Sequence, residues 1–140
     1  MRKYCALSNI PSNTLKETFT YLFNICDKVN IYFPNEASLE IMNFKDTFLK
    51  AAHIANLSNE LLSTEDALEE KEGYAMIIAS LTDEIKELIL NINAHFSLSL
   101  GLINGDKVIF YIGDAGECII EDAEDSDIFS SPLFNTFKTI

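Results

Sequence analysis

An alternating apolar segment in the last third of the chain constrains the fold more than any other feature. Every second residue from Phe96 to Leu102 is large and apolar, and the residues between them are small or polar, which is the period of a strand with one buried face. Asn104-Gly105 follows, a pair that tolerates the left-handed angles of a tight hairpin turn. We therefore predict that Phe96 to Ile103 and Lys107 to Ile112 pair as antiparallel neighbours.

A second turn extends this hairpin into a meander. The segment Gly113-Asp114-Ala115-Gly116 is rich in turn-forming residues, and Glu117 to Glu121, with three apolar residues at its centre, follows it as a third strand. Antiparallel sheets of this kind commonly bury one face against other elements. The predicted fold class is therefore α+β, an antiparallel sheet with a C-terminal β-meander and helices packed on one face.

The first third of the chain adds two strands and a helix between them. Lys3 to Leu7 and Val29 to Phe33 are short runs rich in apolar residues, and a proline follows each within a few residues, so both predict strands. A helix is expected to start within Ser12 to Thr14, where Thr14 and Glu17 have the spacing of a capping box. Its apolar stripe comprises Leu15, Phe19, Leu22, Phe23 and Cys26.

A short strand and a second helix are expected next. Leu39 and Ile41 flank a glutamate, which indicates a strand, and Asn43 with Asp46 indicates a helix start. The apolar residues at helical spacing that continue this helix are Phe44, Phe48, Ala51, Ala52, Ala55 and Leu62.

The stretch from Ser63 to Asn93 admits two interpretations. Ser63 or Thr64 can cap a charged helical turn, and apolar residues keep helical spacing beyond it, although Gly73 in a helix interior costs up to ~1 kcal/mol. By its length, Tyr74 to Ser80 could instead be a buried strand before a helix capped at Thr82. We favour the continuous helix.

The size of the chain indicates one domain. Its 140 residues can bury one core but not two, so we expect a single domain over residues 1–140. Within it we distinguish a charge-neutral β-α-β-α part over 1–60, an acidic helix plus meander over 61–122, and a C-terminal tail over 123–140 that is too apolar to be left in water. Because no window approaches the ~18 apolar residues of a membrane helix, a soluble, cytoplasmic protein is expected.

The residue types that most often carry catalysis occur here without a motif. His53 and His95, the only histidines, are interpreted as a helix-surface and a strand-entry residue. Cys5, Cys26 and Cys118 are an odd number, lack short spacing and lie in apolar patterns, which favours buried, reduced thiols. The chain has no CxxC, HxxxH or HxH pair and no phosphate-binding glycine loop. We therefore expect no catalytic residue, no metal ligand and no cofactor such as zinc, iron or a nucleotide.

The net charge of −12 is concentrated in the second half of the chain. Residues 1–60 hold six acidic and six basic residues, whereas residues 61–100 and 101–140 each hold eight acidic and two basic residues. Such a field repels nucleic-acid phosphates and anionic lipid surfaces and attracts basic proteins. We therefore expect a basic protein partner, and neither nucleic acid nor a membrane.

Two acidic stretches, Glu65 to Glu72 and Glu117 to Asp127, form the candidate partner-binding site. The second contains the run Glu121 to Asp127, which lacks the spacing of an EF-hand and is interpreted as a solvated loop, with a weak divalent-ion site left open. Tyr74, Phe129 and Phe134 are candidate apolar anchors beside these stretches. The candidate carboxylates are Glu65, Asp66, Glu69, Glu70, Glu72, Glu117, Glu121, Asp122, Glu124, Asp125 and Asp127.

These features favour a non-catalytic binding domain over an enzyme. In size and acidity, without any shared motif, the chain is similar to immunity proteins that neutralise nuclease toxins. The predicted function is a cytoplasmic immunity or inhibitor protein that neutralises a basic, nuclease-type toxin by direct binding. The alternatives are a small enzyme of another family, or a regulatory, adaptor or phage-derived interaction protein. A homo-oligomer formed through an exposed strand edge is also left open.

Overall fold

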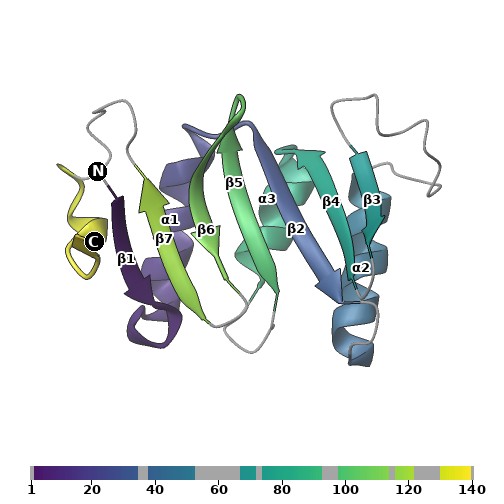
Figure 1. The fold of residues 1–140 in the computed structure, drawn as a ribbon, viewed down its shortest axis with the longest axis horizontal. Coiled ribbons are helices and arrows are strands. Elements are labelled where there is room, and N and C mark those ends of the chain that lie inside the picture. The colour runs from purple at the N-terminus through teal and green to yellow at the C-terminus, as the bar shows by residue number, and fades with distance from the viewer. Residues whose placement is uncertain are drawn as a thin grey trace.

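An eight-stranded antiparallel sheet organises the chain (Figure 1). The computed structural model describes residues 2–34, 38–52, 67–71, 74–92, 98–113, 116–121 and 130–139. The order of strands across the sheet is β3-β4-β2-β5-β6-β7-β1-β8, and each pair of neighbours is antiparallel. The strands are β1 (Arg2–Ala6), β2 (Lys28–Pro34), β3 (Ala67–Lys71), β4 (Tyr74–Ser80), β5 (Ser99–Asn104), β6 (Lys107–Ile112), β7 (Glu117–Glu121) and β8 (Lys138–Thr139).

Helices cover one face of this sheet and lie behind the strands in Figure 1. They are α1 (Ser12–Phe23), α2 (Leu39–Ala51) and α3 (Asp83–Leu90), and two short 3-10 turns, η1 (Leu7–Asn9) and η4 (Pro132–Phe134), accompany them. The predicted α+β class, with an antiparallel sheet, a C-terminal meander and helices on one face, is therefore confirmed. Among the described residues, no helix combines the length and the apolar character needed to cross a membrane.

The β5–β6 hairpin has the turn that the sequence predicts. Gly105 adopts a φ of 65°, a left-handed angle that glycine reaches without a steric penalty, and its N–H donates a hydrogen bond to Asp27 Oδ1 at 3.1 Å. Antiparallel pairing of β5 with β6 is confirmed from Leu100 onward. Phe96, at the start of the predicted segment, lies outside the described residues.

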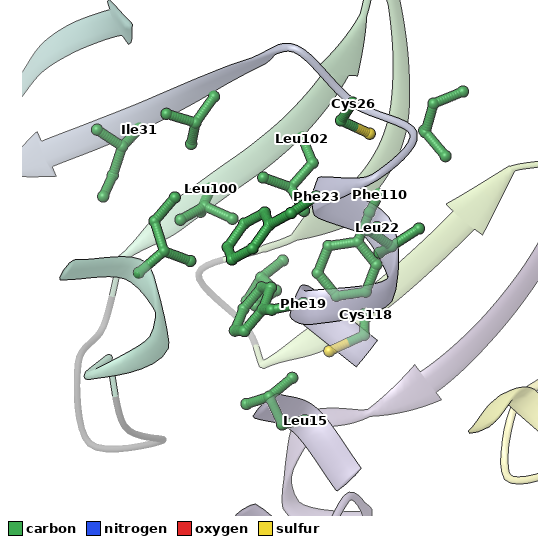
Figure 2. Packing of buried hydrophobic residues seen from close by; sticks show 14 of the residues in the cluster. Leu15, Phe19, Leu22, Phe23, Cys26, Ile31, Leu100, Leu102, Phe110 and Cys118 are labelled. Atoms are coloured by element: carbon green, nitrogen blue, oxygen red, sulfur yellow. The ribbon is translucent and has the colours of Figure 1, made fainter. Parts of the chain in front are cut away.

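The core lies between the sheet and the helices. Along β2, Val29, Ile31 and Phe33 are fully buried and alternate with residues that point to the opposite face. Figure 2 shows the packing on the helix side, where the rings of Phe19 and Phe110 meet edge to face with centroids 5.7 Å apart. The other buried helix residues include Leu15, Leu22, Phe23, Phe48, Ile85 and Ile89. The predicted apolar stripe of α1 is therefore confirmed.

The C-terminal tail packs on α1. Phe134 and Phe137 are buried, and the ring of Phe134 meets Tyr21 of α1 and Phe137 with centroid distances of 5.8 and 5.6 Å. Strand β8 then pairs with β1, so the two ends of the chain lie at the same edge of the sheet (Figure 1). The expectation that the apolar tail is not left in water is confirmed for these two phenylalanines.

The capping box predicted for α1 does not form. The helix begins at Ser12, directly after Pro11, and has no side-chain cap. Pro11 is the N-cap residue, with an extended ψ of 146°, and its carbonyl accepts the first intrahelical hydrogen bond from the Leu15 N–H at 2.9 Å. Thr14 and Glu17 therefore lie inside the first turns.

Helix α2 begins four residues before the predicted start at Asn43. The Ser38 hydroxyl accepts a hydrogen bond from the Ile41 N–H at 3.3 Å, which caps a helix that starts at Leu39. The predicted short strand at Leu39 and Ile41 is therefore wrong. The helix ends at Ala51, and the predicted continuation through Ala55 and Leu62 lies outside the described residues.

The continuous helix favoured from Ser63 to Asn93 is also wrong. Ala67–Lys71 and Tyr74–Ser80 are the paired strands β3 and β4. The alternative interpretation is confirmed, because Tyr74–Ser80 is a strand and the Thr82 hydroxyl caps α3 by accepting from the Ile85 N–H at 3.3 Å. The part predicted as an acidic helix plus meander, residues 61–122, therefore contains two strands before its helix.

Candidate partner-binding face

In the described part of the chain, no helix lies over the other face of the sheet (Figure 1). The pairing registers place one residue from each of several adjacent strands in a continuous row across this face. From β8 to β4 the row is Lys138, Tyr4, Ile119, Tyr111, Gly101, Asn30 and Ile78. We call the surface around this row the open face.

Apolar and aromatic side chains form the part of the open face over β1, β7 and β6. Tyr4 is 45% exposed, and Ile119 and Tyr111 are half-buried. On the helix side of the same strands, Phe110 and Ile120 are fully buried. Clustered apolar side chains that water can reach are typical of surfaces that contact another molecule.

The side chain of Asn30 packs against Gly101 at the centre of the open face. Its carboxamide oxygen occupies the space that a Cβ at position 101 would need, so glycine at that position makes room for it. That oxygen is buried, and within the described segments it has no hydrogen-bond partner. Asn30 and Gly101 therefore approach each other closely at the centre of the open face.

A bulge in β6 lies beside a hollow of the open face. Leu102 pairs with Phe110 and Ile103 with Val108, so Ile109 is an extra residue in β6. Val108 stands 44% exposed beside this bulge. The adjoining shallow hollow has a volume of about 230 Å³ and is lined by Arg2, Val108, Ile109, Phe110, Tyr111, Ile119 and Glu121.

Arg2 and Glu121 meet at the rim of this hollow. They are directly opposite each other in the pairing of β1 with β7, and Arg2 Nη2 donates a hydrogen bond to Glu121 Oε2 at 3.1 Å. The two side chains are 57% and 38% exposed. An ion pair in contact with water typically contributes roughly 0–1 kcal/mol to stability, so this contact can be exchanged for another at little cost.

The structure does not bring the two predicted acidic stretches together. Glu69 and Glu70 belong to β3 at one edge of the sheet, whereas Glu117 and Glu121 belong to β7, and four strands lie between. At a spacing of ~4.8 Å per strand, β3 and β7 are roughly 24 Å apart. The remaining candidates, which lie outside the described residues, are Glu65, Asp66, Glu72, Asp122, Glu124, Asp125 and Asp127.

The apolar anchors of the open face differ from the predicted ones. Phe134 is buried against α1 and is therefore not an exposed anchor, Tyr74 begins β4, and Phe129 lies outside the described residues. Sequence reasoning missed Tyr4 and Tyr111. The available signal was that β6, with the sequence KVIFYI, is apolar at both alternating sets of positions, as in strands covered on both faces.

The three cysteines are buried and free, as predicted. Burial, with a smaller contribution from the charge of Asp27, raises the pKa of Cys26 to about 12. Burial, followed by the proximity of Cys5 and Glu117, raises the pKa of Cys118 to about 12. Because a thiol attacks as its thiolate, neither Cys26 nor Cys118 is poised as a nucleophile near neutral pH.

A second hollow, of about 440 Å³, lies between α2 and α3 and is lined by Thr47, Lys50, Ala51, Glu84, Glu87, Leu88 and Asn91. Over the ranges that the structure describes, no three His, Cys, Asp or Glu side chains gather as they would around a metal ion. His53 and His95 lie outside those ranges. Most of the residues that line this second hollow are polar or charged, whereas the open face presents Tyr4 and Val108, so the open face is the better candidate for contact with a protein.

Comparison of the chain with protein-family models, with curated proteins and with solved structures finds no match. The interpretation of the open face therefore depends on its own residues and geometry.

Proposed function

We propose that this protein is a non-catalytic binding domain that captures a basic protein on the open face of its sheet. In its most specific form, it is a cytoplasmic immunity protein that neutralises a basic, nuclease-type toxin by covering the surface with which the toxin holds phosphates. The observation that supports this most strongly is the accessible apolar cluster of Tyr4, Ile119, Tyr111 and Val108 on the face away from the helices.

The composition of the open face supports contact with a protein. A sheet face that is simply solvated alternates polar residues with the buried ones of the other face, yet β6 and β7 present Val108, Tyr111 and Ile119 there. Tyrosine is enriched at the centres of protein interfaces, because one side chain offers a large apolar area and a hydrogen-bonding hydroxyl. The cluster has the chemistry of such a centre.

The charge of the chain supports a basic partner. Glu117 and Glu121 stand at the two ends of β7, on either side of Ile119, and the acidic run through Asp127 continues directly from Glu121 in the sequence. With a net charge of −12 on 140 residues, long-range attraction accelerates encounter with a positively charged protein. Charge would then steer the partner to a face on which apolar contacts hold it.

The apolar part of the proposal is tested by changing the face and, as a control, the helix layer. Tyr4→Ala combined with Tyr111→Ala removes two rings from the open face, whereas Lys16→Ala combined with Glu17→Ala alters an exposed, charge-balanced pair on α1. Each form is used to capture partners from the source cell, and the affinity for the purified partner is then measured. We expect the native and control forms to retain the same basic protein and the face variant to bind it at least roughly thirtyfold more weakly.

The electrostatic part is tested on the same partner by reversing Glu121, Asp122, Glu124 and Asp125 to lysine together. Association rates measured at two ionic strengths should fall in this variant and lose much of their dependence on salt. Retention of acidic partners alone, or rates indifferent both to salt and to the four reversals, would contradict the proposal. So would a face variant that binds as tightly as the native chain.

A further inference from the structure

We propose that the hollow of the open face is a subsite for one arginine side chain of the basic partner, and that the chain's own Arg2 competes for it. The inference rests on the proposed function and specifies the residue type that the open face recognises. Its occupant is a guanidinium group on a methylene stem, presented by a protein surface.

The walls and the rim of the hollow match the two parts of an arginine side chain. Val108 and Ile119 supply aliphatic surface and Tyr111 supplies a phenol ring, while the Glu121 carboxylate lies at the rim. An arginine buries its methylene stem against apolar surface and holds its charged head at a carboxylate, and an aromatic ring adds attraction for the cation. The volume of about 230 Å³ is of the order that one such side chain needs.

Arg2 shows that this carboxylate accepts a guanidinium. It lines the hollow and donates from Nη2 to Glu121 Oε2 at 3.1 Å. More than half of its side chain is nevertheless exposed, so the internal pair gains little from burial. A guanidinium that enters from a partner, shielded from water by the partner's surface, would interact with Glu121 more strongly than Arg2 does.

The competition predicts that removing Arg2 and removing the Glu121 charge change the affinity for an arginine ligand in opposite directions. Removing Arg2 frees Glu121 and should tighten the binding of an arginine ligand, whereas removing the Glu121 charge should weaken it. Any loss of one positive charge also raises the general attraction of the chain for cations. The comparison therefore needs a second cation and a second carboxylate far from the hollow, and exposed Lys16 and Glu17 on α1 provide them.

The test titrates the intact protein with the tripeptide acetyl-Gly-Arg-Gly-amide and follows the methyl signals of Val108 and Ile119 by NMR. The same peptide with uncharged citrulline in place of arginine reports binding that does not need the charge. We expect the arginine peptide to shift both methyl signals. Arg2→Ala should bind it about three to ten times more tightly than Lys16→Ala, and Glu121→Gln should bind it more weakly than Glu17→Gln by a similar factor.

Equal affinities for Arg2→Ala and Lys16→Ala, or equal shifts from the citrulline peptide, would overturn the subsite. This titration needs no partner protein, so its result is independent of the capture experiment. If the Tyr4 and Tyr111 double variant loses its partner while the peptide titrations show none of the expected differences, the subsite is wrong, but the open face is still where the partner binds. If the peptide arms succeed while that variant keeps its partner, the open face binds arginine but is not where the partner docks.

Discussion

Phe110→Ala is expected to lower the free energy of unfolding by ~3–5 kcal/mol. Phe110 has no exposed surface, and its ring meets that of Phe19 in α1 at a centroid distance of 5.7 Å. Its strand neighbours Leu102 and Ile120 are also fully buried. Truncation therefore leaves a cavity among close-packed groups, and the sheet and the helix cannot both move to fill it.

Tyr111→Ala is the matched control, because Tyr111 is the next residue of β6 and lies on the open face. We expect it to change stability by about 1 kcal/mol or less while weakening capture of the partner. Urea denaturation of the native chain and the two variants measures both losses of stability. Equal losses for the two neighbours would show that the two faces of β6 are assigned wrongly.

Alkaline pH is expected to destabilise the protein through Cys26 and Cys118. The ordinary thiol pKa of 9.0 holds in the unfolded chain, whereas burial raises the pKa of each folded thiol to about 12. Above pH 9 the unfolded state therefore binds fewer protons than the folded state. The contribution of each thiol is complete below pH 9 and is lost as the pH rises toward 12, at about 1.4 kcal/mol per pH unit.

Urea denaturation between pH 7 and pH 10.5 measures this slope. Cys26→Ala and Cys118→Ala should each reduce the fall in stability above pH 9 by about 1.4 kcal/mol per pH unit relative to the native chain. Val29→Ala, a fully buried substitution without a titrating group, should lower stability by the same amount at every pH. An alkaline slope that is the same in all four proteins would contradict the burial of these thiols.

The sequence is informative about strands that have one apolar face and about a helix with a single stripe. The β5–β6 hairpin, with its Asn104-Gly105 turn, follows from the two-residue period and from the tolerance of glycine for φ of 65°. The stripe from Leu15 to Cys26 predicts the buried side of α1 for the same reason. In each case the period and the turn chemistry indicate the same element.

Prediction failed at β4, where both faces are apolar and no turn such as Asn104-Gly105 precedes the strand. In β4, Ile77 and Ala79 are buried toward the helices while Met76 and Ile78 lie half-buried on the open face. The strand therefore has no alternation of apolar with polar residues, and its apolar residues also satisfy helical spacing. The start of α2 was predicted wrongly for a local reason. The Ser38 cap is a single hydrogen bond, and the alternation of Leu39 with Ile41 obscures it.

The proposed binding face could be predicted only in part from the sequence. The count of acidic residues locates charge along the chain, but strand order decides where charge lies in space, and β3 and β7 are separated by four strands. The cluster around Tyr111 could not be predicted, because Tyr4, Ile119 and Tyr111 belong to three different strands and are brought side by side only by the pairing registers. The local pattern in β6, which is apolar at both alternating sets of positions, does not show which strands lie beside it.

Photo-crosslinking in the source cell measures which face the partner contacts. A photoreactive phenylalanine derivative is placed at exposed Val108 on the open face in one form, and at exposed Lys16 on α1 in the other. We expect the Val108 form to crosslink to a basic protein, and the Lys16 form to give no crosslink to that protein. A basic partner trapped from position 16 and not from position 108 would contradict binding on the open face.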